Sequence, residues 1–193
     1  YYVGIAIDCL SKMIVKLPPD ANSQVCRAMI GKLSDVNTAG EFRGIYATAL
    51  NSIIKSVSIE YGIQLKELLG DCIRAAMQTA SSTHQASNKI QELLIEVVDA
   101  FITKWPTMVS KLELNRMEFA KLLLDNIIRN ATPSKTNASM LCLGRYSGTL
   151  RQEELEKVLF KGGLVSYASE CKDDHTKKIA LFALKFILQN ANR

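Results

Sequence analysis

The chain has 193 residues, of which 48% are hydrophobic and 22% are charged, and its formal net charge is +5. This composition supports a packed core and argues against global disorder. The excess of basic over acidic residues is small, and the Lys and Arg residues are dispersed along the chain. No uncharged run approaches the ~20 apolar residues that are needed to span a membrane. We therefore expect neither a membrane nor nucleic acid as the partner.

Apolar residues recur at helical spacing along the chain, and no useful stretch alternates apolar and polar residues with a period of two. The pattern therefore predicts an all-α protein. The predicted helices, in chain order, are Val3–Leu17, Asn22–Leu33, Glu41–Glu60, Gln64–Thr79, Ser87–Lys104, Asn115–Asn130, Lys135–Ser147, Gln152–Ser169 and Asp174–Ala191.

Helix-breaking residues fall between these segments. Pro18-Pro19 and Trp105-Pro106 end helices, because proline lacks an amide donor and clashes with the preceding turn. Asn22, Asn115 and Asp174 are predicted N-caps, since their side-chain oxygens can accept hydrogen bonds from free amides. The Gly162-Gly163 pair lies inside the eighth predicted helix, and we expect it to kink that helix or split it in two.

One amphipathic segment recurs along the chain. CLSKMIVKLP, which ends at Pro18, aligns with VVDAFITKWP, which ends at Pro106. The matched positions in the five copies are Leu10, Leu50, Val98, Leu143 and Leu184, with steps of 40, 48, 45 and 41 residues. Helical units of ~40–47 residues are typical of HEAT and armadillo arrays, and the irregular steps favour HEAT units.

Two helices per repeat predict antiparallel pairs stacked side by side. The expected fold is thus an α-α superhelix, a HEAT/ARM-like solenoid of about four and a half helix pairs. Residues 1–193 would form a single segment of a longer protein. The odd-numbered helices, here called the B helices, would form the inner layer and the even-numbered A helices the outer one. A compact helical bundle is the alternative fold.

Motifs that carry chemistry are missing from the sequence. His84 and His175 lack the spacing of a metal site, and no nucleophile or phosphate-binding motif is present. We expect no metal, no cofactor and no enzymatic activity. Five scattered cysteines predict reduced thiols in a cytoplasmic or nuclear protein, and the matched positions of Cys9 and Cys142 predict roles in core packing. Trp105 replaces Leu17 in the repeat and is expected to fill the core.

Charged residues on the B helices are the candidate partner-binding groups. B helices line the concave face of such solenoids, where charge patterns can select a partner. The order is basic, acidic, basic, although ordinary solvated helix faces would give the same pattern. The candidates are Lys12, Lys16, Glu92, Glu96, Asp99, Lys177, Lys178 and Lys185.

Two passages resemble known repeats. Ala131–Leu150 resembles a HEAT inner helix, with Lys135 at the basic position and Ala138 at the small one, although the usual turn aspartate and Val-Arg pair are missing. Ile5–Leu33 is similar to a HEAT unit of the cullin-associated Cand proteins, in which an inner helix ends in a Leu-Pro-Pro-like turn.

The resemblance implies a curved, non-catalytic solenoid that wraps a cullin–RING ligase scaffold and controls the exchange of its substrate receptors. The alternatives are a karyopherin-like transport solenoid, whose helices follow the same pattern, and a helical-bundle enzyme.

Overall fold

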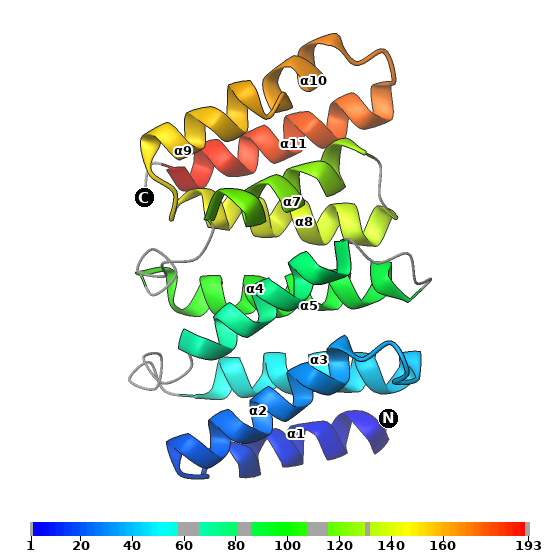
Figure 1. Ribbon diagram of the computed structural model, residues 1–193, viewed down its shortest axis with the longest axis vertical. Coiled ribbons are helices and arrows are strands. Elements are labelled where there is room, and N and C mark those ends of the chain that lie inside the picture. Colours follow the sequence, from blue (N-terminus) through cyan, green and yellow to red (C-terminus); the bar gives the residue numbers. More distant parts are fainter. Residues whose placement is uncertain (1, 58–65, 81–85, 108–115, 130–131, 192–193) are drawn as a thin grey trace. The chain divides into compact units, whose positions relative to one another are not determined.

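The computed structural model describes residues 2–57, 66–80, 86–107, 116–129 and 132–191, and the secondary structure within these ranges is helical, without strands. The all-α prediction is confirmed for this part of the chain. The helices group into two compact units, Tyr1–Met108 (unit 1) and Val109–Arg193 (unit 2) (Figure 1). His84 and the predicted helix ends at Glu60, Gln64, Asn115 and Asn130 lie outside the described residues.

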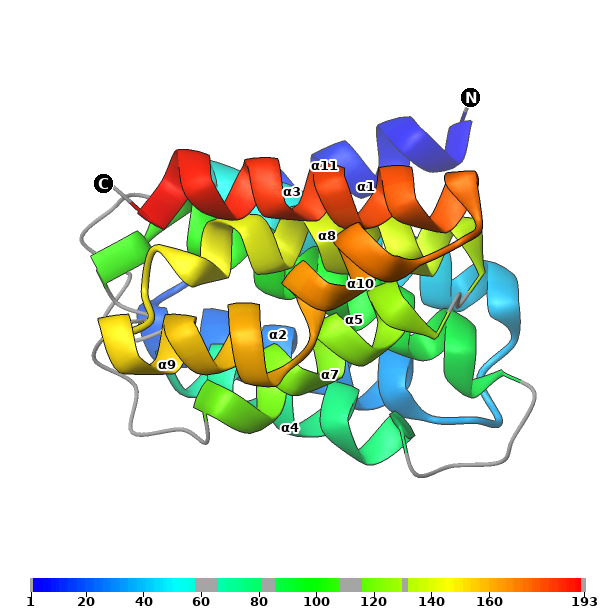
Figure 2. The ribbon, with the colours of Figure 1, turned by 90° about the horizontal axis from the view of Figure 1, so that it is seen from above.

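Unit 1 contains five described helices, which form two layers. Helix α1 packs on α3 and α3 packs on α5, whereas α2 and α4 pack on each other in the second layer (Figure 2). The first layer therefore consists of the odd-numbered predicted helices, the B helices, and the second of the even-numbered A helices. The helices are α1 (Tyr2–Ile14), α2 (Pro19–Ser34), α3 (Gly40–Ser56), α4 (Lys66–Ala80) and α5 (Ser87–Lys104).

Hydrogen bonds fix the helix directions in unit 1. Buried Gln91, near the start of α5, donates to the carbonyl of Ala76, near the end of α4, at 3.1 Å, so α4 and α5 are antiparallel. Lys104, at the end of α5, donates to the carbonyls of Ile54 and Lys55 at 2.6 Å each and to that of Val57. Helices α3 and α5 are therefore parallel, and the Lys104 ammonium caps the negative end of α3.

Unit 2 has the same two-layer construction. Helix α8 packs on α11 in one layer, and α7 packs on α10 and η2 in the other. Antiparallel packing of α7 and α8 brings Asn126 within 3.1 Å of Ser139, and the Tyr167 hydroxyl of α10 donates to the last carbonyl of α7, that of Ile128, at 2.6 Å. The elements are α7 (Arg116–Ile128), α8 (Pro133–Ser147), α9 (Gln152–Glu156), η2 (Lys157–Lys161), α10 (Leu164–Glu170) and α11 (Asp174–Ala191).

The eighth predicted helix is divided at Gly162-Gly163, as expected. Its first part, α9, continues into the π-helical turn η2, and α10 begins after the glycines. A Cβ atom on Gly162 would lie 2.6 Å from the backbone oxygen of Val158, and Gly163 has a φ of +83°. Both positions therefore require glycine, the first for space and the second for backbone conformation.

Helices α8 and α11 approach each other closely at Gly144. A Cβ atom at this position would lie 2.6 Å from Cβ of Phe186, so only a glycine lets the two helices pack at this distance. Near their C-terminal ends, Ser147 donates to the carbonyl of Ile187 at 3.5 Å, so these two B helices are also parallel.

Three sequence-based assignments were wrong. Asn22 does not cap α2, which begins at Pro19; its buried amide instead donates to the carbonyl of Ile14 at 3.1 Å, at the end of α1. The N-cap of α11 is Asp173, whose carboxylate accepts from the Thr176 amide at 2.8 Å. Cys9 is exposed rather than in the core, whereas Cys142 is buried as predicted; all five thiols are free.

Candidate functional site

The charged candidates predicted from the sequence lie on or just after three B helices, two of them in unit 1 and one in unit 2. Lys12 lies in α1, and Lys16 follows the end of that helix. Glu92, Glu96 and Asp99 lie in α5. Helix α3 packs between α1 and α5, so the basic and acidic groups of unit 1 are separated by one helix (Figure 1). Unit 2 carries the remaining three candidates, which are lysines of α11.

The basic group of α1 is solvated. The Lys12 ammonium lies 2.7 Å from the Asp8 carboxylate, one helical turn away, and both side chains are exposed. This hydrogen bond, followed by the charge of Asp8, raises the pKa of Lys12. An exposed pair of this kind contributes little to stability, so Lys12 can turn towards a partner at small cost.

The acidic candidates share one side of α5, since their spacing is four and then three residues. Glu92 is buried, and its carboxylate lies 2.5 Å from the Lys89 ammonium. Glu96 lies at the surface, but its carboxyl group is partly buried. This partial burial is the main cause that raises the pKa of Glu96, and the negative charge of Glu92 adds to it, whereas the positive charge of Lys89 lowers the pKa. Glu96 is therefore the acidic candidate best placed to meet a cation from a partner.

The lysines of α11 differ in exposure. Lys178 and Lys185 are exposed, whereas Lys177 is half-buried. Lys177 and Lys178 lie in the first turns of the helix, close in sequence to the capping carboxylate of Asp173. Hydrogen bonds from Thr176 lower the pKa of Asp173, so it is anionic at neutral pH. The negative charge of Asp173 thus partly balances the positive charges of Lys177 and Lys178 at the start of α11, whereas Lys185 lies further along the helix.

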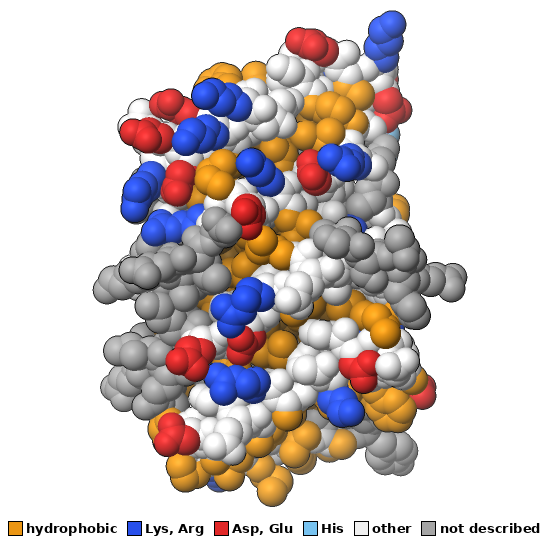
Figure 3. Space-filling model, in the orientation of Figure 1, with side chains coloured by type: hydrophobic (Ala, Val, Ile, Leu, Met, Phe, Trp, Pro, Cys, Tyr) orange, Lys and Arg blue, Asp and Glu red, His pale blue; other side chains and the backbone are white. Residues whose placement is uncertain are grey.

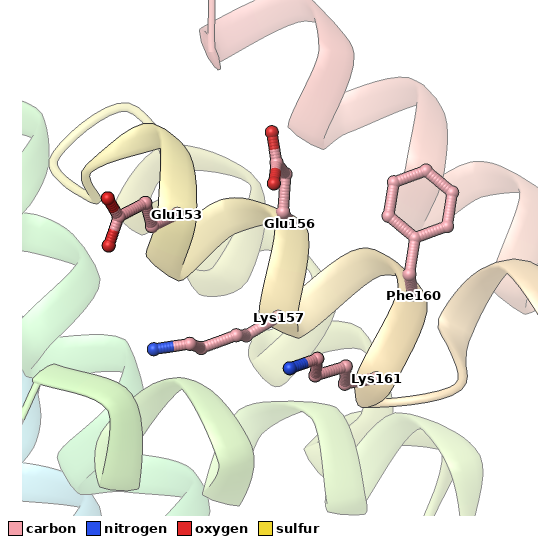
Figure 4. Close-up of a pocket in the computed structure, with 5 residues that line it drawn as sticks. All are labelled: Glu153, Glu156, Lys157, Phe160 and Lys161. Carbon is pink, nitrogen blue, oxygen red and sulfur yellow. The ribbon is translucent and has the colours of Figure 1, made fainter.

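Sequence reasoning missed an open hollow in unit 2. Its volume is about 300 Å³. Phe160 is 64% exposed beside the hollow, although it is a large aromatic residue. Figure 4 shows the side chains of Glu156 and Phe160 on one side of the helical segment and those of Lys157 and Lys161 on the other. The lining residues are Glu153, Glu156, Lys157, Phe160 and Lys161.

The hollow combines features of a protein-contact site. Exposed aromatic side chains are common anchors at interfaces, and the nearby charges can pair with groups of either sign. Phe160 belongs to the π-helical turn η2, and turns of this kind are frequent at functional sites. One feature of the sequence could have indicated this site. In the eighth predicted helix, a phenylalanine and charged residues follow one another at spacings of three and four, which places them on one side of the helix.

Trp105 fills the core of unit 1, as its repeat position predicts. It is 5% exposed, and its ring centroid lies 5.8 Å from that of Phe101. The Lys104 ammonium lies 5.1 Å from the centroid of the Trp105 ring, within the range of a cation–π contact. This tryptophan is therefore not available to a partner at the surface.

Features of a metal centre or a membrane span do not occur in the described ranges. Over these residues no group of three or more His, Cys, Asp and Glu side chains is placed to hold a metal ion. No helix of the described structure is both long and apolar enough to cross a membrane. Comparison with protein-family models, with curated proteins and with solved structures finds no match to the chain.

Proposed function

We propose that this chain is a non-enzymatic protein-interaction scaffold built from HEAT-like repeats. Support comes from the layers of unit 1, where α1, α3 and α5 follow one another as B helices and α2 and α4 lie beside them. Unit 2, considered by itself, also has two layers of helices. Solenoids of this kind present long surfaces to other proteins rather than closed catalytic cavities.

Ion pairs that span one repeat support this register. Arg27 of α2 lies 2.9 Å from Glu67 and 3.3 Å from Asp71, both in α4. These residues are separated in sequence by 40 and 44 positions, which is the expected repeat length. Figure 3 shows acidic and basic side chains next to each other over α2 and α4. Because these ion pairs are exposed to solvent, they contribute little to stability. Their main effect is on how the two neighbouring A helices are aligned.

The hollow beside Phe160 is the contact surface that we assign to this function, and it is the observation on which the proposal rests. Burying the Phe160 side chain against a partner would be favourable, and its charged neighbours can fix the partner's orientation. The hollow is open to solvent and all its lining residues belong to one helical segment. An enzyme of the helical-bundle type would instead need a closed pocket with converging polar groups.

The first partner to test is a cullin–RING scaffold, because Ile5–Leu33 is similar to a HEAT unit of the Cand proteins. A karyopherin-like role is the second candidate. Affinity purification of the tagged chain from cells, with mass spectrometry of the bound proteins, separates the two. Cullins would support the first role, whereas a small GTPase or nucleoporin repeats would support the second.

The contact surface is tested with Phe160→Ala. We expect this variant to retain its fold and lose most of the partner, whereas Phe42→Ala should retain the partner. Phe42 is a suitable control because it is 50% exposed and lies on α3, outside the hollow. Equal recovery by both variants would remove the hollow from the proposal. If the wild-type chain recovered no protein above background, the scaffold role itself would be rejected.

A further inference from the structure

Three exposed lysines lie on two neighbouring elements in the A layer of unit 2. They are Lys121 of α7 and Lys157 and Lys161 of η2, and α7 packs on η2. Figure 4 shows that the side chains of Lys157 and Lys161 leave their helical segment on the side away from Glu156 and Phe160. The two lysines of η2 therefore share one side of this segment. We call the three residues the lysine cluster.

The packing of α7 on η2 brings the three lysines together. The side chain of Leu124 in α7 reaches Gly162, where a Cβ atom would lie 2.5 Å from one of its methyl groups. Lys161 directly precedes Gly162 in the chain. Lys121 lies three residues before Leu124, which places both on the same side of α7. The lysine cluster therefore lies across the boundary between α7 and η2.

The lysine cluster has no counter-charge in the part of the chain that the structure describes. None of its three ammonium groups forms an ion pair there. The carboxylates one turn before and after Lys121 do not pair with it, and the later one, Asp125, lies 3.5 Å from Arg129. Glu153, one turn before Lys157, lines the hollow without pairing with that lysine. Like charges held together in this way repel one another.

The corresponding boundary in unit 1 has the opposite arrangement of charge. There α2 and α4 are neighbouring A helices, and Arg27 lies 2.9 Å from Glu67 and 3.3 Å from Asp71. Charges thus attract across the boundary between α2 and α4, whereas they repel across the boundary between α7 and η2. An anionic group from outside the chain would turn this repulsion into attraction.

We propose that the lysine cluster binds an acidic segment of the protein partner. This inference rests on the proposed role of the hollow as a protein contact, since Lys157 and Lys161 line it. A short acidic segment can be confined to the cluster. A nucleic-acid backbone carries a charge on every phosphate, and it would continue past the carboxylates of Glu153 and Glu156, which repel it. The charge pattern therefore favours a peptide over a nucleic acid.

The test measures the affinity of the chain for a fluorescently labelled oligoglutamate peptide by fluorescence anisotropy at low salt. A double variant, Lys157→Glu with Lys161→Glu, reverses the charges on η2. Lys121→Glu reverses the charge on α7, and it tests the cluster even if the double variant does not fold, which far-UV circular dichroism verifies. The control is Lys178→Glu with Lys185→Glu, which makes the same change of net charge at exposed positions of α11.

We expect the double variant to bind the peptide at least about tenfold more weakly and Lys121→Glu about threefold more weakly, because each attraction becomes a repulsion. The control should change the affinity by less than about twofold, since its charges lie on another helix and are screened by salt. Equal weakening by the control would show that net charge alone matters and would overturn the proposal. A wild type that does not bind the peptide would overturn it too.

A single-stranded oligonucleotide of equal charge separates the two kinds of anion. Tighter binding of the oligonucleotide than of the peptide would overturn the proposal in favour of a nucleic acid. The partner-recovery experiment with Phe160→Ala keeps this inference distinct from the proposed function. Loss of the cellular partner in that variant, together with no binding of oligoglutamate by the wild type, would reject the acidic segment and leave the contact at the hollow in place.

Discussion

The close approach of α8 and α11 makes Gly144→Ala a sensitive test of the packing in unit 2. The new methyl group would lie 2.6 Å from Cβ of Phe186, far inside van der Waals contact. Because Cβ belongs to the rigid base of the side chain, no rotation of the phenylalanine relieves the clash. The helices must separate by roughly 1 Å, and overpacking of this kind costs about 1–3 kcal/mol.

A second effect works in the opposite direction. Replacing a helical glycine with alanine stabilises a helix by about 1 kcal/mol when space is free. The net loss for Gly144→Ala should therefore be about 0–2 kcal/mol, whereas Gly44→Ala should gain about 0.5–1 kcal/mol. Gly44 lies in α3, and a Cβ atom there would meet nothing within 4 Å. Phe186→Ala should fail to rescue the first variant, since alanine keeps the clashing atom.

Urea denaturation followed by far-UV circular dichroism measures both changes. The reasoning requires the same substitution to be clearly less favourable at position 144 than at position 44. If Gly144→Ala gained as much stability as Gly44→Ala, the close packing of α8 on α11 would be refuted. A larger loss at position 44 would contradict the free space described around α3.

Three further predictions concern Leu143, Cys26 and Lys104. Leu143→Asp places a charge at a fully buried position of α8. This substitution should lower the free energy of unfolding by about 3–5 kcal/mol and reduce the helical circular dichroism signal. The control Asn137→Asp, on the exposed side of α8, should change both little. Burial raises the pKa of the Cys26 thiol from 9.0 to about 11, so the folded state keeps a proton that the unfolded state loses. Stability should therefore fall as pH rises from 9 towards 11, with a slope steeper than that of Cys26→Ala by up to about 1.4 kcal/mol per pH unit; equal slopes in urea denaturation would contradict this. Lys104→Met removes the ammonium group that caps α3, and it should lower the stability of unit 1 by about 1 kcal/mol. The loss is measured by following Trp105 fluorescence during denaturation. An unchanged denaturation midpoint would show that the cap contributes nothing.

Periodicity was sufficient to predict the helices and their order. The prediction Ser87–Lys104 coincides with α5, and Asp174–Ala191 coincides with α11. These helices have strong apolar stripes and clear breakers or polar turns at their ends, so local sequence decides their limits. The division at Gly162-Gly163 was also foreseen, because two adjacent glycines destabilise a helix wherever it packs.

The candidate site was much less predictable. Charge on a B helix could be read from the sequence, but the burial of Glu92 beside Lys89 depends on packing around α5. The exposure of Phe160 depends on the π-helical turn, which rotates the following residues relative to a regular α-helix. Periodicity treats an exposed phenylalanine as a core residue, and so the hollow was missed.

The sequence by itself determined that the described chain is helical and where α5 and α11 begin and end. These properties follow from local spacing, proline and glycine, and they need no knowledge of neighbouring helices. Tertiary structure alone decided that Asn22 serves the end of α1, that Gly144 admits Phe186, and that Leu10 is exposed while Leu50 is buried. Each of these depends on which helix lies alongside, and residues in the same repeat position carry the same local signal whether or not a neighbour covers them.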